Sequence, residues 1–155
     1  MTELGDLIAR DAVRANLSVA SKKALFGALA EIAADQIGGD PAAIQARLAE
    51  REKLGSTGFG GGIAIPHARV EGVDRVAGVF VRLLKPLDFK AIDDLPVDLV
   101  FMLVSPVDAG AAHLKALALV SRRLRDRGFA AKLRGAGLRD AIYALLVGVE
   151  ARDAA

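Results

Sequence analysis

Residues 51–69, REKLGSTGFGGGIAIPHAR, combine a glycine-rich segment, two hydroxyl side chains and a short apolar run that leads to one of the two histidines. Glycines let backbone N–H groups approach an anion closely, and hydroxyl and guanidinium groups donate hydrogen bonds to its oxygens. A histidine with an ordinary pKa of about 6.5 is largely neutral at pH 7, so its ring nitrogen can act as a nucleophile. The pattern therefore indicates that His67 takes up a phosphoryl group.

Two helices are predicted before this segment. Ser21 is a suitable N-cap for a helix over 22–37, and glycines follow that stretch. Asp40 and Pro41 are the cap and first residue expected of a second helix, which closes where the glycine-rich segment begins. Arg51 then lies in the last turn of the second helix, from which its side chain can reach residues beyond the glycine-rich segment.

The glycine-rich segment itself is predicted to be a loop that leads into a short strand. Residues 55–62 contain too much glycine for the interior of a helix or strand. Residues 63–65 are predicted to form a strand that Pro66 ends, because proline lacks the N–H that a sheet needs. His67 is therefore expected at the end of a strand, where functional side chains of α/β proteins gather.

The two longest apolar runs predict the centre of a sheet. Residues 76–84 and 97–104 are nearly continuous in apolar and β-branched side chains, as in strands that helices cover on both faces. Turn-like sequences at 85–87 and 93–96 separate them.

Two more helices are predicted over 110–127, ended by Gly128, and over 138–149. The order helix, helix, strands, helix, helix predicts an α/β fold with a helix-covered mixed sheet. A length of 155 residues suits a single domain, residues 1–155, with its core over about 5–149.

Composition excludes several classes of protein. There is no cysteine, which excludes disulfides and thiolate metal sites, and a net charge of +2 with few aromatic residues gives no basis for nucleic-acid binding. No apolar run is long enough to span a membrane and Met1–Arg10 lack a signal-peptide pattern, so we expect a cytoplasmic protein without membrane insertion. The spacing of the histidines and Asp108 demands no metal ion, so none is expected.

The same segment also has a specific resemblance to a known family. The sequence GSTGFGGGIAIPH at residues 55–67, preceded by REKL, resembles the signature of enzyme IIA domains of the bacterial phosphotransferase system, in its mannitol, fructose and nitrogen branch. The likeness continues in SKK at 21–23 and in HLKALALVSRRL at 113–124. It implies a three-layer α/β/α sandwich with a mixed sheet of about five strands, covered by helices on both faces.

The resemblance also implies roles for three residues. His67 is the phosphoryl acceptor, through Nε2, and the phosphohistidine forms without a cofactor. The donor is a histidine phosphocarrier protein (HPr- or NPr-like), itself phosphorylated by enzyme I from phosphoenolpyruvate. His113 steadies the phosphoryl oxygens, and Arg51 offsets the charge of the transition state, which spreads over those oxygens.

Other residues of the segment have two interpretations each. Ser56 and Thr57 donate hydrogen bonds to a phosphoryl oxygen or a ring nitrogen, or they bond to the loop's own backbone. With Gly58 and Arg69 they form the predicted phosphoryl-binding loop, although Arg69 is equally suited to plain surface charge. Glu52 is expected to be a solvated helix residue.

Two functions fit the same family. In the nitrogen branch the phosphorylation state of the protein regulates target proteins, and in the sugar branch an enzyme IIB receives the phosphoryl group for sugar uptake. We expect no fused IIB or membrane segment, and residues 17–25, LSVASKKAL, resemble the nitrogen-type proteins more closely. The nitrogen-regulatory function is therefore preferred. The sequence leaves open which targets are regulated and whether the chain forms a homodimer.

Overall fold

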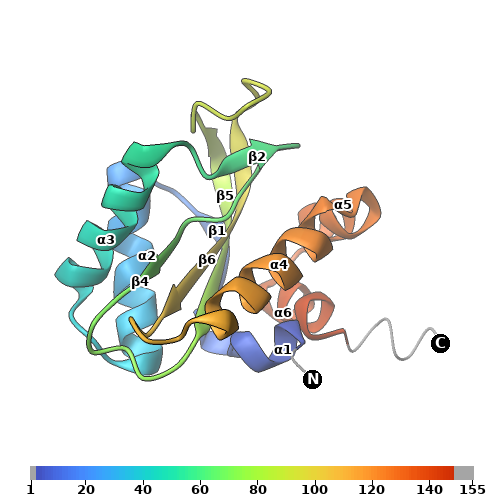
Figure 1. The fold of residues 1–155 in the computed structure, drawn as a ribbon. Coiled ribbons are helices and arrows are strands. Elements are labelled where there is room, and N and C mark those ends of the chain that lie inside the picture. Colours follow the sequence, from blue (N-terminus) through green and yellow to red (C-terminus); the bar gives the residue numbers. More distant parts are fainter. Residues whose placement is uncertain (1–2, 149–155) are drawn as a thin grey trace.

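The computed structural model describes residues 3–148 and arranges them as one mixed sheet between two layers of helices (Figure 1). In chain order, the elements are α1 Leu4–Leu7, a 3₁₀ turn Arg10–Ala12, β1 Val13–Leu17, α2 Lys22–Ile37, α3 Pro41–Leu54, β2 Gly58–Gly60, β3 Ile63–Ala64, β4 His67–Arg69, β5 Ala77–Leu87, β6 Val97–Ser105, α4 Ala111–Arg125, α5 Arg127–Gly135 and α6 Arg139–Val147.

The sheet is built around the antiparallel pair β5 and β6. Within residues 3–148 it has six strands in the order β1-β5-β6-β3-β2, and β4 also pairs with β6. β1 runs parallel to β5, and β3 and β4 both run parallel to β6, whereas β2 is antiparallel to β3. Strands β3 and β4 therefore follow one another along the same side of β6, separated by Ile65 and Pro66.

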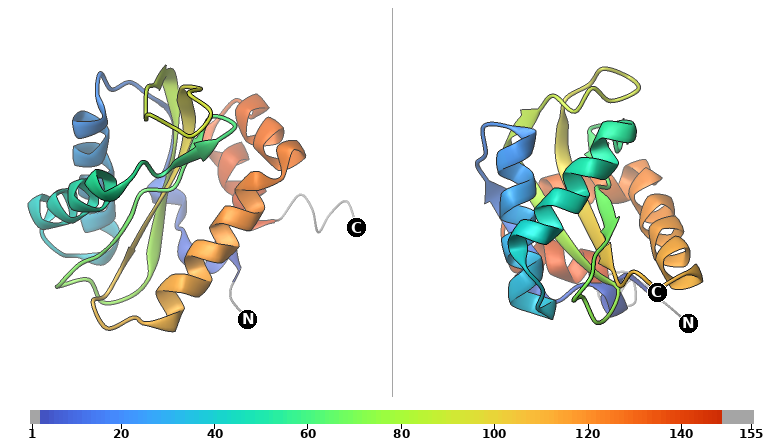
Figure 2. Two further views of the ribbon diagram at one scale, coloured as in Figure 1. Left: turned by 45° about the horizontal axis from the view of Figure 1, so that its top comes forward. Right: turned by 60° about the vertical axis from the view of Figure 1, so that its left-hand side comes forward.

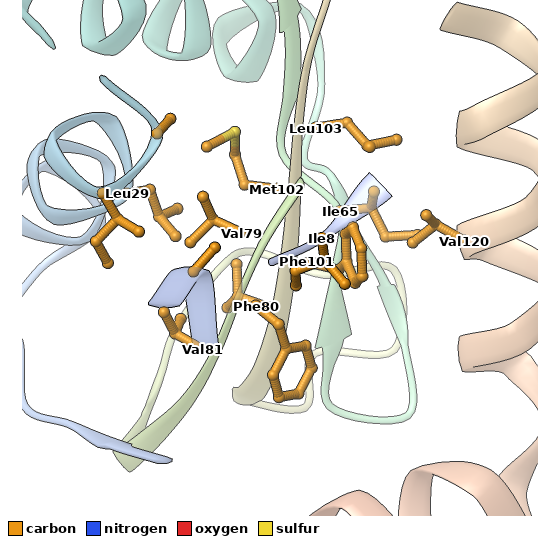
Figure 3. Packing of buried hydrophobic residues seen from close by; sticks show 14 of the residues in the cluster. Ile8, Leu29, Ile65, Val79, Phe80, Val81, Phe101, Met102, Leu103 and Val120 are labelled. Atoms are coloured by element: carbon orange, nitrogen blue, oxygen red, sulfur yellow. The ribbon is translucent and has the colours of Figure 1, made fainter. Parts of the chain in front are cut away.

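Helices cover both faces of the sheet. α2 and α3 lie against one face, and α4, α5 and α6 lie on the other with the short α1 (Figures 1 and 2). Figure 3 shows Val79 and Met102 on the side of Leu29 of α2, and Phe101 on the side of Val120 of α4. Because side chains of a strand alternate between faces, both faces of β6 and of β5 up to Leu83 are buried, as their apolar sequences predict. The predicted three-layer α/β/α sandwich is confirmed.

The first two long helices form as their end residues predict. The Ser21 side chain accepts a hydrogen bond from the backbone N–H of Ala24, and Asp40 Oδ1 accepts one from Ala42 N, each at 3.0 Å. Pro41 fills the first position of α3, where a helix has no use for an N–H.

The glycine-rich segment contains a strand that its sequence does not predict. Residues 58–60 form β2, which pairs with β3, so the prediction of a loop over 55–62 is wrong there. A Cβ atom on Gly58 would lie 3.0 Å from the Ala91 side chain and 3.2 Å from that of Phe89. Glycine at position 58 thus lets this strand pack closely against a neighbouring segment.

Two other strand boundaries differ from the predictions. His67 begins β4 instead of ending a strand, because pairing with β6 resumes after Pro66, whose carbonyl oxygen accepts from Leu103 N. Residues 85–87 are the end of β5 and not a turn, since Leu87 still pairs with Val97 after a register shift.

Residues 110–148 contain one more helix than predicted. The predicted helix over 110–127 ends at Arg125, and Asp126 accepts a hydrogen bond from Phe129 N to start α5. The last predicted helix is α6, which begins after Leu138. Its predicted end at Val149 lies outside the described residues. Near the start of the chain, α1 and β1 are also present without having been predicted.

Among residues 3–148, no helix combines the length and the apolar character needed to cross a membrane.

The contact between Gly78 and Phe101 gives a test of the sheet's packing. A Cβ atom at position 78 would lie 2.8 Å from Cζ of Phe101 and closer still to Cε1. We expect Gly78→Ala to lower the free energy of unfolding by about 1–3 kcal/mol, because the ring must move within a filled core. Gly135→Ala is the control, since its Cβ would meet nothing within 4 Å. Denaturant unfolding that gives equal stabilities for the two variants would contradict this packing.

Candidate functional site

Three charged or ionisable side chains from three elements meet over one end of the sheet. Arg51 comes from the last turn of α3, His67 from the first position of β4, and His113 from the first turn of α4. They share an open cleft, whose lining comprises Arg47, Glu50, Arg51, Lys53, Leu54, His67, Ala68, Arg69, His113, Leu114 and Leu117. The residues predicted to form the centre of the site are therefore neighbours in space.

Hydrogen bonds fix the tautomer of the half-buried His67 ring. Nδ1 lies 2.8 Å from the carbonyl oxygen of Ile65. Because a carbonyl oxygen only accepts, Nδ1 carries the proton and donates it. The lone pair is then on Nε2, which accepts a hydrogen bond from Nε of Arg51 at 3.3 Å. The unprotonated ring nitrogen of His67 is thus Nε2.

The surroundings keep this ring neutral. Burial lowers the pKa of His67 below its ordinary value, and the positive charge of Arg51 lowers it further. The hydrogen bond to Ile65 and the negative charge of Glu52 act in the opposite direction without reversing the shift. At neutral pH the lone pair on Nε2 is therefore available for bonding.

His113 lies beside His67 and is almost fully buried. The two ring centroids are 5.8 Å apart, and His113 is 5% exposed. Burial lowers the pKa of His113, and the charges of Arg69 and of His67 add to that effect. Two neutral imidazoles thus share one side of the cleft. An anion bound there would favour the protonation of either ring.

Ser105 holds the second histidine in place, a role that was not predicted. Its hydroxyl lies 2.7 Å from Nδ1 of His113, and the residue is fully buried at the end of β6. The only signal in the sequence is a hydroxyl residue that closes a long apolar run. Such a position predicts that the hydroxyl has a hydrogen-bond partner, but not which one.

Of the basic residues that line the cleft, Arg51 and Arg69 bring positive charge to the two histidines. Arg51 donates through Nη1 to the carbonyl oxygen of Gly55 at 3.0 Å, which fixes the direction of its guanidinium group. Arg69 is exposed at the end of β4 and lowers the pKa of His113 by its charge. Both therefore lie where they can act on an anion bound between the histidines.

The hydroxyl groups of Ser56 and Thr57 bond to the protein itself. Ser56 Oγ donates to the carbonyl oxygen of Phe89 and accepts from Gly58 N, while Thr57 Oγ1 donates to Glu52 Oε1 at 2.6 Å. Neither residue belongs to the lining of the cleft, and nor does Gly58, which is buried. The Ser56 hydroxyl thus bonds to the loop's own backbone at Gly58, one of its two interpretations, whereas the Thr57 hydroxyl bonds to the carboxylate of Glu52, which neither interpretation gave.

The prediction that Glu52 is solvated is wrong. Its side chain is only 8% exposed and accepts a hydrogen bond from Nζ of Lys22 at 2.9 Å, in addition to those from Thr57. Lys22 belongs to α2, so the bonding involves a contact between helices that the sequence of α3 alone does not reveal.

Within residues 3–148, no three side chains of histidine, cysteine, aspartate or glutamate are grouped so that they could hold a metal ion.

The chain is similar to known proteins over most of its length. Residues 6–148 match the family model described as phosphoenolpyruvate-dependent sugar phosphotransferase system, EIIA 2. The chain is 46% identical over 141 residues to a "Nitrogen regulatory protein" of Bradyrhizobium diazoefficiens, covering 91% of this chain and 92% of that protein. A protein of the same name from Escherichia coli K12 is 39% identical over 149 residues, which covers 96% of this chain and 91% of the relative.

Solved structures of IIA proteins have a similar fold. The crystal structure of nitrogen regulatory protein IIA-Ntr from Neisseria meningitidis superimposes with a TM-score of 0.86 at 32% identity, covering 92% of this chain and 98% of that one. The crystal structure of IIA mannitol from Escherichia coli gives a TM-score of 0.74 over 89% of this chain and 97% of that one. Its identity of 22% supports a likeness of fold alone.

The geometry of His67 predicts its titration. We expect the ring to titrate with a pKa below 6.5, because it is partly buried beside Arg51. Arg51→Ala should raise this pKa, since it removes a positive charge that opposes protonation, whereas Arg75→Ala, at an exposed pair with Asp74, should leave it unchanged. NMR titration of the ring protons measures both values. A pKa above 6.5 in the unmodified protein, or a lower one in Arg51→Ala, would contradict the geometry.

Proposed function

Because the chain belongs to the EIIA type 2 family of the phosphoenolpyruvate-dependent sugar phosphotransferase system, we propose that it is a phosphocarrier that accepts a phosphoryl group on Nε2 of His67. The observation that carries this proposal is the pair of hydrogen bonds of the His67 ring. Nδ1–H donates to Ile65, and the lone pair of Nε2 faces Arg51 in an open cleft.

The transfer proceeds by attack of Nε2 on the phosphorus of a phosphohistidine in the donor protein. A bond forms between Nε2 of His67 and phosphorus while the bond between phosphorus and the donor's ring nitrogen breaks, and its electron pair returns to the donor ring. The His67 ring gains positive character as it loses its lone pair. The carbonyl oxygen of Ile65, which accepts from Nδ1–H at 2.8 Å, stabilises that change.

Arg51 and His113 act on the phosphoryl oxygens. As the new bond takes up the lone pair of Nε2, the Nε–H of Arg51 is released from it and can donate to an oxygen instead. One charge pair at about 4 Å contributes on the order of 4 kcal/mol at an effective dielectric constant near 20, before the cost of desolvation. His113, with its ring centroid 5.8 Å from that of His67, is placed to donate to a second oxygen.

The cleft is bordered by groups suited to transient contact with a donor protein. Leu54 is 85% exposed and Leu114 is 60% exposed, on the two helices that flank the histidines. We propose that a histidine phosphocarrier protein (HPr- or NPr-like), phosphorylated by enzyme I, docks over these leucines from the cytoplasm. The mannitol IIA of Escherichia coli, which has a similar fold, has been solved in complex with phosphorylated IIB.

The regulatory role is preferred over sugar transport because relatives named "Nitrogen regulatory protein" match at 39–46% identity over more than nine tenths of the chain. Phosphorylation adds about −1.5 to −2 charges at pH 7. In a cleft whose lining includes Arg51 and Arg69, such a change offsets much of the local positive charge and so alters the affinity for target proteins. A sugar-specific role is supported by the match to a "PTS system fructose-specific EIIA component" of Haloferax volcanii, which is 35% identical over 132 residues.

The proposed reaction predicts the behaviour of single variants. Incubated with phosphoenolpyruvate, enzyme I and the phosphocarrier protein, the chain should acquire one acid-labile phosphoryl label. His67→Ala should abolish the label, and His113→Ala should slow its appearance by roughly 10- to 1000-fold without removing it, because only an oxygen ligand is lost. Arg75→Ala is the control with unchanged kinetics. Label retained in folded His67→Ala would exclude His67 as the acceptor.

The choice between the two roles predicts the fate of the label. When the phosphorylated chain is mixed with a fructose-type IIB and its membrane permease, we expect no rapid phosphorylation of sugar. Its affinity for a regulatory target should differ from that of the unmodified chain by about tenfold or more, because the charge at the cleft changes. Rapid phosphorylation of sugar in this mixture would favour the sugar-transport role instead.

A further inference from the structure

We propose that Glu52 is a positioning residue for phosphoryl transfer. Through two series of hydrogen bonds, its carboxylate fixes the positions of the acceptor ring of His67 and of the guanidinium group of Arg51. The inference rests on the proposed function of His67 as acceptor. It assigns a role to a side chain that touches neither the phosphoryl group nor the reacting nitrogen.

The carboxylate of Glu52 is the centre of a partly buried hydrogen-bond network. It accepts hydrogen bonds from Nζ of Lys22 at 2.9 Å, from Thr57 N at 3.1 Å and from Thr57 Oγ1 at 2.6 Å. With the side chain 8% exposed, removing the carboxylate leaves an ammonium group, a backbone N–H and a hydroxyl in need of new partners. The network therefore specifies one position for Thr57.

One chain of hydrogen bonds leads from Thr57 to the acceptor. The carbonyl oxygen of Thr57 accepts from Ile65 N at 3.1 Å. The carbonyl oxygen of the same Ile65 accepts from Nδ1 of His67 at 2.8 Å. The position of Thr57 therefore sets the position of the oxygen that fixes the tautomer of His67.

A second series of hydrogen bonds leads from the same segment to Arg51. The backbone between Glu52 and Thr57 includes Gly55, whose N–H donates to Glu52 O at 3.2 Å and whose carbonyl oxygen accepts from Nη1 of Arg51 at 3.0 Å. That bond orients the guanidinium group, and its Nε reaches Nε2 of His67 at 3.3 Å. Both partners of the contact between Arg51 and His67 thus depend on the short segment that Glu52 holds.

Lys22 fixes the carboxylate from the opposite side. Its Nζ also donates to the carbonyl oxygen of Phe89 at 3.1 Å and lies 4.6 Å from the centroid of the Phe89 ring. The same carbonyl oxygen accepts from Ser56 Oγ. The Glu52 network is therefore anchored to α2 and to the segment after β5, which gives it little freedom to shift.

The charge of Glu52 has a second effect on His67. It raises the pKa of the ring and so opposes the burial and the Arg51 charge that lower it. A neutral side chain at position 52 is expected to lower the pKa of His67 even where the hydrogen bonds to Thr57 persist. Geometry and charge can therefore be separated by two substitutions.

The test compares Glu52→Ala, Glu52→Gln and, as control, Glu31→Ala on the exposed side of α2. The first readout is the rate of transfer from phosphorylated HPr at saturating donor, well below the melting temperature of every variant. We expect Glu52→Ala to be about 10- to 100-fold slower than the unmodified protein, because a small misplacement of reacting groups has effects of that size. Glu52→Gln should recover much of the rate, since its amide oxygen can still accept from Thr57.

The second readout is the ¹⁵N NMR spectrum of the His67 ring, which a purely structural role in stability would not change. Glu52→Ala should populate the other tautomer or a mixture, whereas Glu52→Gln should keep the proton on Nδ1 and lower the pKa of the ring. If Glu52→Ala does not fold, the spectrum and pKa of Glu52→Gln still decide the matter. An unchanged rate and tautomer in folded Glu52→Ala, or an unchanged or raised pKa in Glu52→Gln, would overturn the proposal. Failure of the proposed function is distinct, since it requires that His67→Ala keeps the label.

Discussion

The hydrogen bond from Nδ1 of His67 to the carbonyl oxygen of Ile65, 2.8 Å long, is the constraint on which the rest of the site depends. It commits one ring nitrogen to the proton and leaves the other with a lone pair. The carbonyl oxygen of Ile65 is available to the ring because Ile65 and Pro66 lie between β3 and β4, the two strands that pair in turn with β6. The interrupted side of the sheet is thus where the fold creates a nucleophile.

The helices around this point supply functional side chains instead of covering the ring. Arg51 reaches it from the end of α3, and His113 from the start of α4, so the two helical layers of the sandwich meet across His67. Helices on opposite faces of a sheet can approach one another only beyond its edge or end. The three-layer architecture therefore places the cleft where both layers contribute side chains.

Much of this could be predicted from the sequence, because its signals are local. Caps at Ser21 and Asp40 gave correct starts for two helices, and the apolar runs of β5 and β6 gave the buried centre of the sheet. The remaining features depend on partners far apart along the chain. The burial of Glu52 requires Lys22, and the role of Ser105 requires His113. Strand β2 exists only because β3 lies beside it, and its glycines gave no strand signal of their own.

The central claim is that Nε2 of His67 bonds to phosphorus while Nδ1 keeps its proton. The most direct measurement is the NMR spectrum of the chain with ¹⁵N-labelled histidine, after phosphorylation by enzyme I and the phosphocarrier protein. We expect coupling between ³¹P and Nε2 of His67, with a protonated Nδ1. Coupling to Nδ1, or to a nitrogen of His113, would contradict it.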